Sequence, residues 1–448
     1  MKLDWTAIPY LKELSGRVDP STGLKNHVQL ARDLARFGPE RFRDEGALIV
    51  VEVLDHDLVR RMFIASGSAA TDGLLREIRS RLQSLLTPRS VLYYVGVGRF
   101  GILTPRATEE LNNLLSSIRE TMAKPCPVGG HMLMVDIVIG CLDIARARAQ
   151  PEDALRKATA AAQSARTLSM QVLHYSASFD RTYIRNHRIL HAVTTAIAEN
   201  QFSLVFQPKL DTGGNISGAE ALIRWQHPEL GNISPAEFIP LTNDTELIVD
   251  ITRWVVREAV RCIGMLAAAG LDFRISVNVS ARDLADAHFA HFLLGLLAQH
   301  AIATAGIQIE CTEYSALKSD RCLACLHALS DAGICIALDD FGNGYSNLAS
   351  LQCLPLDKLK IDKSLIDSIV DSEHALILLE SIVDLGKRLG YRLVAEGVET
   401  RDMFAVLRDM GFDELQGYAI ARPMPVSDLI AFCRSHAPAS FAAEADAC

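Results

Sequence analysis

Residues 334–340 read ICIALDD, a short apolar run that ends in two adjacent aspartates, Asp339 and Asp340. Seven further runs of this kind follow one another through the second part of the chain, and amphipathic helical stretches separate them. They are SLVFQ (203–207), ISGAEALIRW (216–225), RISVNVS (274–280), IQIECTE (307–313), DKLKID (357–362), YRLVAEGVE (391–399) and FDELQGY (412–418). A strand–helix unit repeated eight times over about 250 residues predicts a closed (β/α)8 barrel of the TIM type.

Each of the eight runs ends in, or just before, a polar or charged side chain. These side chains are Gln207, Glu220, Arg224, Asn278, Glu310, Glu313, Asp339, Asp340, Lys360, Asp362, Glu396, Glu399 and Gln416. We expect them to meet at one barrel mouth, where the carboxyl ends of the strands point. A single strand-end acid is more often a helix N-cap or a surface ion pair, and Lys360 alone could be a solvated charge. Their joint occurrence favours a functional site, because unpaired buried polar groups are costly.

Carboxylates are the largest group among these side chains: Glu220, Glu310, Asp339, Asp340 and Glu396. Five negative charges at one mouth repel strongly unless cations neutralise them. Oxygen ligands, with Asn278 as a neutral donor, favour Mg²⁺ or Mn²⁺ over zinc. Two such ions about 4 Å apart are a recurrent device for phosphate-ester hydrolysis, and one of the adjacent aspartates could bridge them. Lys360 could orient the attacking water or meet the phosphate.

The apolar periodicity breaks around residues 178–190, where the stretch SASFDRTYIRNHR (residues 176–188) is polar and charged. We therefore predict four parts: a first domain over 1–177, a linker over 178–190, the barrel over 191–435 and a flexible tail over 436–448. In the first domain, apolar runs at 47–55, 91–97, 100–104 and 132–140 predict strands. Helical patterns near 27–37, 67–86, 107–122 and 152–165 alternate with them. This alternation predicts an α/β sandwich, a sheet with helices packed on it.

Charge and composition narrow the partners and the compartment. The 448 residues include 45 Lys and Arg and 54 Asp and Glu, which gives a formal net charge of −9. Such a chain is a poor candidate for binding duplex nucleic acid through its phosphates. The sequence has no long apolar run, and its charged first residues do not resemble a signal peptide, so we expect no membrane span. Ten cysteines, mostly inside apolar runs, are too few for a disulfide scaffold and indicate a reducing compartment, the cytoplasm.

The residues Glu220, Ala221 and Leu222, followed by IRW, resemble the signature of EAL-domain cyclic-di-GMP phosphodiesterases. Further blocks in the family's order are FQPKL (206–210), SVNVS (276–280), IECTE (309–313), DDFGNGYSN (339–347), LKID (359–362), VAEGVET (394–400) and QGYAIARPMP (416–425). The resemblance covers residues 186–430. It implies that the barrel cuts one phosphodiester of cyclic-di-GMP to give linear pGpG, with two Mg²⁺ or Mn²⁺ ions per active site. It also implies a homodimer.

The resemblance further implies a role for each matching residue. The implied metal ligands are Glu220, Asn278, Glu310, Asp339, Asp340 and Glu396. The implied catalytic residues are Glu220, Asp340, Lys360 and Glu396. The implied contacts to the dinucleotide are Gln207, Leu222, Arg224, Glu399 and Gln416. Glu313 would brace the loop after the paired aspartates, and Asn347 stands in that loop where the family usually has serine.

The first domain resembles the GGDEF domain of diguanylate cyclases, through DPSTGLKNH (19–27) and the strand–turn–strand at 91–104. The signature position reads Gly96, Val97, Gly98, Arg99 and Phe100, without the family's acidic pair. The family's first metal-binding Asp falls on Glu52. Because Arg99 would repel Mg²⁺, the resemblance implies a domain that no longer cyclises GTP. Two roles stay open: a regulatory domain that binds GTP, and a packing or dimerisation module.

Two other functions fit parts of the pattern. One is a receptor that binds cyclic-di-GMP without cutting it and signals through the first domain or a partner protein. Degenerate receptors usually lack one or more ligands, whereas this sequence has all of them. The other is an unrelated barrel enzyme of the enolate or aldol kind, which would also use acids, Lys360 and Mg²⁺. That function leaves the ordered sequence blocks unexplained.

Overall fold

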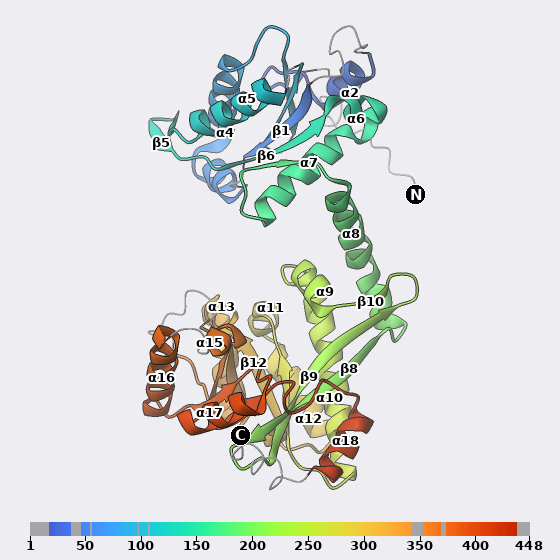
Figure 1. Ribbon diagram of the computed structural model, residues 1–448, viewed down its shortest axis with the longest axis vertical. Coiled ribbons are helices and arrows are strands. Elements are labelled where there is room, and N and C mark those ends of the chain that lie inside the picture. Colours follow the sequence, from blue (N-terminus) through green and yellow to red (C-terminus); the bar gives the residue numbers. More distant parts are fainter. Residues whose placement is uncertain are drawn as a thin grey trace. The chain divides into compact units, whose positions relative to one another are not determined.

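The computed structural model describes residues 18–36, 46–53, 56–96, 98–105, 108–342, 351, 353–368 and 373–436. The chain forms two compact units, Met1–Arg185 and Asn186–Cys448 (Figure 1). Within the described residues, no helix combines the length and the apolar character that a bilayer crossing requires.

The first unit is a five-stranded sheet with helices on both faces. Its strands are β1 (Ala47–Val53), β2 (Val91–Gly96), β3 (Arg99–Thr104), β6 (Ile137–Asp143) and β7 (Val172–His174), in the order β2-β3-β1-β6-β7. Its main helices are α2 (His27–Arg36), α4 (His56–Ser84), α5 (Thr108–Met122), α6 (Ile144–Ala149) and α7 (Pro151–Thr167). A short hairpin, β4 (Cys126–Val128) with β5 (His131–Leu133), lies beside them, so the predicted strand at 132–140 divides into β5 and the start of β6.

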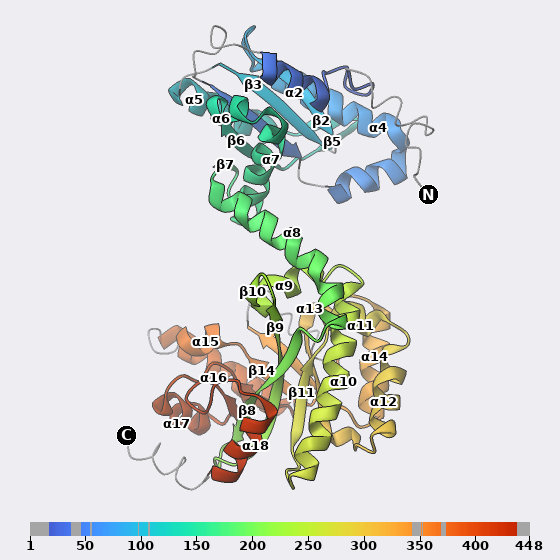
Figure 2. The ribbon, with the colours of Figure 1, turned by 90° about the vertical axis from the view of Figure 1, so that its right-hand side faces the viewer.

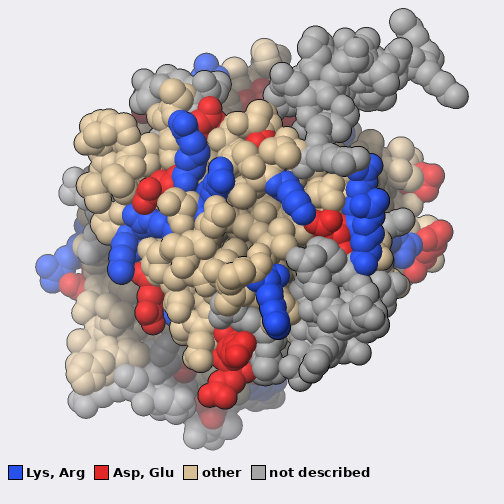
Figure 3. Space-filling model, turned by 90° about the horizontal axis from the view of Figure 1, so that it is seen from above, with Lys and Arg blue, Asp and Glu red and all other residues tan. Residues whose placement is uncertain are grey.

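Strand β1 explains why this sheet is covered on both sides. Every residue of β1 is buried, and neighbouring residues point to opposite faces. Ile49 and Val51 pack in the cluster that includes α4 and α5, whereas Leu48 and Val50 pack in the cluster of α2, α6 and α7. The predicted α/β sandwich is confirmed. On the face shown in Figure 3, Lys and Arg side chains are interspersed with acidic and uncharged ones.

The second unit is a closed eight-stranded barrel. The strands are β8 (Phe202–Asp211), β9 (Ile216–His227), β11 (Arg274–Asn278), β12 (Ile307–Thr312), β13 (Cys335–Phe341), β14 (Lys358–Ile361), β15 (Arg392–Ala395) and β16 (Glu414–Gln416). They pair in chain order from β9 to β16, and β8 closes the barrel by pairing with both β16 and β9. The short β10 (Gly231–Ile233) extends β9 at the edge. The predicted (β/α)8 class is therefore confirmed.

Helices surround this barrel (Figure 2). The longer ones are α10 (Leu247–Ala268), α12 (Phe289–Gln299), α14 (Asp320–Asp331), α16 (Glu373–Arg388), α17 (Arg401–Met410) and α18 (Val426–Ser435). The shorter ones are α9 (Pro235–Thr242), α11 (Ala281–Ala285), α13 (Glu313–Leu317), α15 (Lys363–Ser368) and the 3₁₀ turn η2 (Thr304–Gly306). The buried residues of α10 recur every three or four positions, at Ile248, Ile251, Val255 and Ala259, which is the spacing that places one helix face on a core.

One strand departs from the expected parallel arrangement. β8 runs antiparallel to both of its neighbours. Residues 212–215, TGGN, join it to β9 in a tight turn, in which Asp211 N donates to Asn215 O at 2.8 Å. So short a connection can join only antiparallel strands, because a parallel crossover needs a dozen or more residues. As a result Gln207 does not lie at a carboxyl end of a parallel strand; it lies in mid-strand, opposite Glu220.

The segment predicted as a linker is helical. α8 (Ala177–Ala198) includes all of residues 178–190, and the division between the two compact units falls inside it. Its second half is anchored by Ile189, Val193 and Ala196, which are buried in the core of the second unit. The polar composition reflects a helix that is largely exposed. Of the predicted tail, residues 437–448 lie outside the described residues.

Candidate active site

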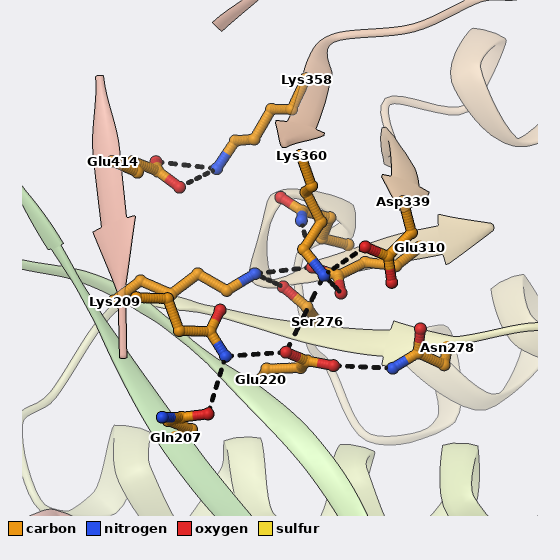
Figure 4. Close-up of polar contacts among 12 residues, drawn as sticks. Gln207, Lys209, Glu220, Ser276, Asn278, Glu310, Asp339, Lys358, Lys360 and Glu414 are labelled. Carbon is orange, nitrogen blue, oxygen red and sulfur yellow. Dashed lines mark hydrogen bonds and ion pairs between the residues drawn. The ribbon is translucent and has the colours of Figure 1, made fainter. Parts of the chain in front are cut away.

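Lys360 of β14 lies at the centre of the predicted acidic residues (Figure 4). Its side chain is fully buried, so it is not the solvated charge that its sequence position also allowed. The Nζ atom lies 2.5 Å from Glu396 Oε1, 2.7 Å from Glu310 Oε2 and 2.9 Å from Asp339 Oδ1. Glu220 Oε2 is 3.9 Å away. Four strands, β9, β12, β13 and the end of β15, thus bring acids to one ammonium group.

The charges in this cluster shift one another's protonation. Burial lowers the pKa of Lys360, but the surrounding carboxylates outweigh it and raise the pKa well above its usual value, so the side chain stays an ammonium. Burial raises the pKa of Glu310, but Lys209 and Lys360 outweigh it and hold this carboxyl ionised. For Glu396 the balance is the opposite: burial, helped by Asp339 and Glu220, raises its pKa to about 8 despite Lys360.

Asp339 and Asp340 both face this cluster because the backbone is irregular there. The β13–β14 ladder shifts register between Leu338 and Phe341, and Asp340 has a φ of 56°. This left-handed conformation is unfavourable for a residue other than glycine and is typical of functional sites. One oxygen each of Asp339, Asp340 and Glu396 lie within 4.8 Å of one another. Burial, with the neighbouring Asp339 and Asp362, raises the pKa of Asp340.

Glu220 is held by amide side chains on both of its oxygens. Asn278 Nδ2 donates to Oε1 and Gln416 Nε2 donates to Oε2, each at 2.8 Å. Gln416 Nε2 also donates to Gln207 Oε1 at 3.1 Å, so the antiparallel β8 still contributes to the site. The structure therefore brings together four predicted residues from β8, β9, β11 and β16.

A pocket of about 320 Å³ opens beside these groups. It is lined by Gln207, Glu220, Leu222, Asp339, Lys363, Glu396, Gly397, Glu399, Gln416, Gly417 and Tyr418. Of the residues expected to contact the dinucleotide, Arg224 is not among these; its guanidinium donates to Ile223 O at 2.8 Å. Glu399 Oε1 pairs with Lys363 Nζ at 3.0 Å.

Two residues that line this pocket, Lys363 and Tyr418, were not predicted from the sequence. Tyr418 has an exposed ring, and the Arg422 guanidinium lies 4.4 Å from the ring centre. Tyr418 and Arg422 belong to the block QGYAIARPMP (416–425). The signal available in the sequence was an aromatic residue between small and basic ones. Glycine is required at Gly397, because a Cβ there would lie 2.4 Å from Lys363 Cγ and its φ is 68°.

Two further buried charged residues of the barrel, Lys209 and Lys358, were also not predicted from the sequence. Lys209 lies inside the barrel, where its Nζ is 2.6 Å from Glu310 Oε1 and 2.9 Å from Ser276 Oγ. Lys358 makes a separate buried pair with Glu414, with distances of 2.7 and 2.8 Å to the two oxygens. The signal for Lys209 was strand alternation: it stands two residues after Gln207 and so shares its face.

The implied metal ligands are not all equivalent in the structure. Asp339, Asp340 and Glu396 have the spacing of a shared metal site. Glu310 has one oxygen bonded to Lys209 and the other to Lys360, and Glu220 is held by amides. Glu313 is half-buried at the start of α13, but residues 343–350, including Asn347, lie outside the described residues, so its bracing role stays a prediction.

In the first unit, Glu52 is nearly fully buried at the end of β1, opposite Arg99 of β3. Its Oε1 accepts hydrogen bonds from Gln163 Nε2 at 2.6 Å and from Arg166 Nη2 at 3.3 Å. The carboxylate at the expected metal position is thus bound to side chains of α7. Val97 of the signature lies outside the described residues.

The chain is similar to known proteins over both units. Residues 190–423 match the EAL domain family, and residues 17–171 match the family described as diguanylate cyclase, GGDEF domain. A cyclic di-GMP phosphodiesterase of Pseudomonas aeruginosa is 33% identical over 414 residues, which are 91% of this chain and 70% of that protein. The bifunctional diguanylate cyclase/cyclic di-GMP phosphodiesterase MucR of the same organism is 30% identical over 92% of this chain and 61% of its own length.

Solved structures are similar as well. The MucR phosphodiesterase in its c-di-GMP complex is 38% identical and covers 54% of this chain and 99% of its own, with a TM-score of 0.52. A GGDEF-EAL segment of LapD from Vibrio cholerae covers 91% of this chain and 97% of its own, with a TM-score of 0.55. At 18% identity the second likeness concerns the fold alone.

Proposed function

Because the chain belongs to the EAL family and has a GGDEF-family domain before its barrel, we propose that the barrel is a phosphodiesterase that hydrolyses cyclic-di-GMP to linear pGpG. The observation that carries the proposal is the convergence of Asp339 and Glu396, two pocket-lining acids, on Lys360, with a carboxylate oxygen of Asp340 close to both acids. Opposite charges arranged in advance around a reacting phosphate are the main means by which such sites lower the barrier.

The donor set fits divalent cations. Asp339, Asp340 and Glu396 place oxygens close together, and burial together with repulsion from neighbouring carboxylates raises the pKa of Asp340; a bound cation would relieve that repulsion. We propose two Mg²⁺ or Mn²⁺ ions per site, held by Glu220, Asn278, Glu310, Asp339, Asp340 and Glu396. When bound, the ions would neutralise charge on the attacked phosphate and activate a water.

The chain's own groups then have distinct tasks. Lys360 keeps three carboxylates in place and offers a positive charge to the water or the phosphate. Glu396 lines the pocket and its Oε1 pairs with Lys360; in its ionised form this carboxylate would accept the proton of the attacking water. Asp340 would help to hold the ions.

The remaining pocket residues suit a guanine dinucleotide. Gln207 and Gln416 offer amides for the base edges, Glu399 an acceptor for base N–H groups, and Leu222 an apolar contact. Tyr418 offers a face on which a base can stack. Arg224 is proposed from the family resemblance alone, as its side chain does not line this pocket.

We propose that the first unit does not cyclise GTP. Glu52 is bonded to Gln163 and Arg166, and Arg99 stands opposite it, so a cation would meet positive charge where the family binds Mg²⁺. Calorimetric titration with GTP, for the wild type and Arg99→Glu, tests whether GTP binding persists. Heat in the wild type would support a regulatory GTP site, and no heat in either protein would exclude it. A homodimer and a cytoplasmic location stay predictions.

One assay tests the main proposal. Purified protein is incubated with cyclic-di-GMP and Mg²⁺, then with EDTA, and products are separated by chromatography. We expect pGpG only with the metal, its loss in Glu220→Ala, and its retention in the matched control Glu380→Ala, an exposed glutamate of α16. Tight binding without turnover in excess Mn²⁺ would instead support the receptor function.

A further inference from the structure

Two histidines of α8 are not among the residues of the candidate active site. His187 and His191 are four residues apart, so they lie on the same face of the helix, and both are exposed. Their Nε2 atoms are 3.1 Å apart, whereas the ring centres are 4.3 Å apart. Because the nitrogens are closer than the ring centres, the two rings turn their Nε2 edges toward each other.

The distance between the two Nε2 atoms is the distance expected between two imidazole nitrogens that bind the same metal ion. A zinc–nitrogen bond is about 2.0–2.1 Å, so two nitrogen ligands are about 3.3 Å apart at a tetrahedral angle and about 2.9 Å apart at a right angle. The observed 3.1 Å lies between these values. A hydrogen bond from one imidazole N–H to the other ring's nitrogen also fits the distance, so the test has to separate the two.

The surroundings permit a cation. Ile189 and Val193 of the same helix are buried in the barrel core, which leaves the histidines on the side that faces solvent. Arg188, the nearest basic residue in sequence, has its charge paired with Glu229 at 2.7 Å. Solvent can therefore complete the coordination of an ion held by the two rings.

We propose that His187 and His191 form a two-histidine clamp for a divalent ion that prefers nitrogen ligands, such as Zn²⁺, Ni²⁺ or Cu²⁺. Mg²⁺ and Mn²⁺ prefer oxygen ligands and do not compete for it. The clamp closes one turn of α8, the helix in which the division between the two compact units falls. A bound ion stabilises that turn, because it binds the helical and not the unfolded arrangement of the pair.

Calorimetric titration of the full chain with Ni²⁺ tests the clamp. The protein carries no polyhistidine tag, and excess Mg²⁺ is present to fill the sites that have oxygen ligands. We expect one Ni²⁺ per chain. His187→Ala and His191→Ala should each weaken binding roughly tenfold or more, and the double variant no further, because a chelate needs both rings. His374→Ala, which changes an exposed histidine of α16, should bind as the wild type does. Equal binding by the wild type and the double variant would overturn the proposal.

A second measurement separates the clamp from a hydrogen-bonded pair. Ni²⁺ should slow amide hydrogen exchange at residues 187–195 of the wild type and leave the same amides of His187→Ala unchanged. The electron paramagnetic resonance spectrum of Cu²⁺ bound to the wild type should show hyperfine coupling to two imidazole nitrogens. Alanine is a strong helix former, so the variants should keep α8. Exchange that does not respond to Ni²⁺, with no two-nitrogen signal, means that the pair is only hydrogen-bonded.

Discussion

Lys209 lies 2.6 Å from Oε1 of Glu310, and both side chains are almost completely buried inside the barrel. The other oxygen of this carboxylate is bonded to Lys360 at 2.7 Å. Gln308 Nε2 also donates to Oε1, at 2.8 Å. Glu310 thus joins Lys209 to Lys360. Lys360 in turn contacts the pocket-lining acids Asp339 and Glu396. The position of Lys360 therefore depends on a residue that does not line the pocket.

Replacing Lys209 by Met should cost about 3–5 kcal/mol of stability, because it removes one partner from a buried pair. Activity should fall as Glu310 and Lys360 shift. The measurements are urea unfolding of the barrel and the rate of pGpG formation. Lys124→Met, at an exposed lysine of the first unit, serves as the control. In the double variant Lys209→Met/Glu310→Gln much of the lost stability should return; a purely additive result would mean that the two side chains do not act as a pair.

Lys360→Met should separate catalysis from metal binding. Removal of one preorganised positive donor lowers kcat by roughly 10²–10³. The same change leaves Glu310, Asp339 and Glu396 without their shared ammonium, so Mn²⁺ should bind more tightly. Steady-state rates and a calorimetric Mn²⁺ titration measure the two effects. Weaker Mn²⁺ binding, with a parallel loss of rate, would show that Lys360 acts only by holding the acids in place.

The barrel could be predicted from sequence because each run, such as ICIALDD, is apolar up to a polar end. The orientation of β8 was also encoded, since TGGN at 212–215 is too short for a crossover. Lys209 was missed because a lysine in a strand is usually taken to point outward. Its position two residues after Gln207 indicated instead that both side chains lie on the same face of the strand.

Other features of the structure depend on contacts between residues that are distant in the sequence, and no local sequence pattern predicts such contacts. The φ of 56° at Asp340 follows from how β13 pairs with β14, a contact between distant segments. The helix α8 was taken as a linker because it is largely exposed, and its polar composition hides the few residues that anchor it, Ile189, Val193 and Ala196. The bonds from Glu52 to Gln163 and Arg166 likewise join residues over a hundred positions apart.

Tyr418→Ala should weaken substrate binding. Stacking of a base on an aromatic ring contributes about 1–3 kcal/mol, so KM should rise about tenfold with kcat little changed. Tyr418→Phe keeps the ring and should retain the wild-type KM. Initial rates over a range of cyclic-di-GMP concentrations give both constants. If both variants raise KM equally, the hydroxyl and not the ring face makes the contact.

Asp33 of α2 should make the first unit sensitive to acid. Burial raises the pKa of Asp33, but hydrogen bonds from Lys25, Gln29 and Tyr93 outweigh it, so the folded pKa lies below the usual value. Between the folded and unfolded pKa values the unfolded chain binds more protons, so stability rises with pH there. The stabilisation is fully present above the unfolded value of about 3.9 and is lost as the pH falls through the folded pKa.

Asp33→Asn should therefore destabilise the first unit by about 1–3 kcal/mol at neutral pH and progressively less as the medium becomes acidic. Thermal unfolding of both proteins between neutral pH and pH of about 3 measures this difference. Asp136→Asn, which changes an exposed aspartate of the same unit, should unfold as the wild type does at every pH. If the difference between Asp33→Asn and the wild type stays constant with pH, the charge of Asp33 does not contribute, and its effect comes from shape and hydrogen bonding alone.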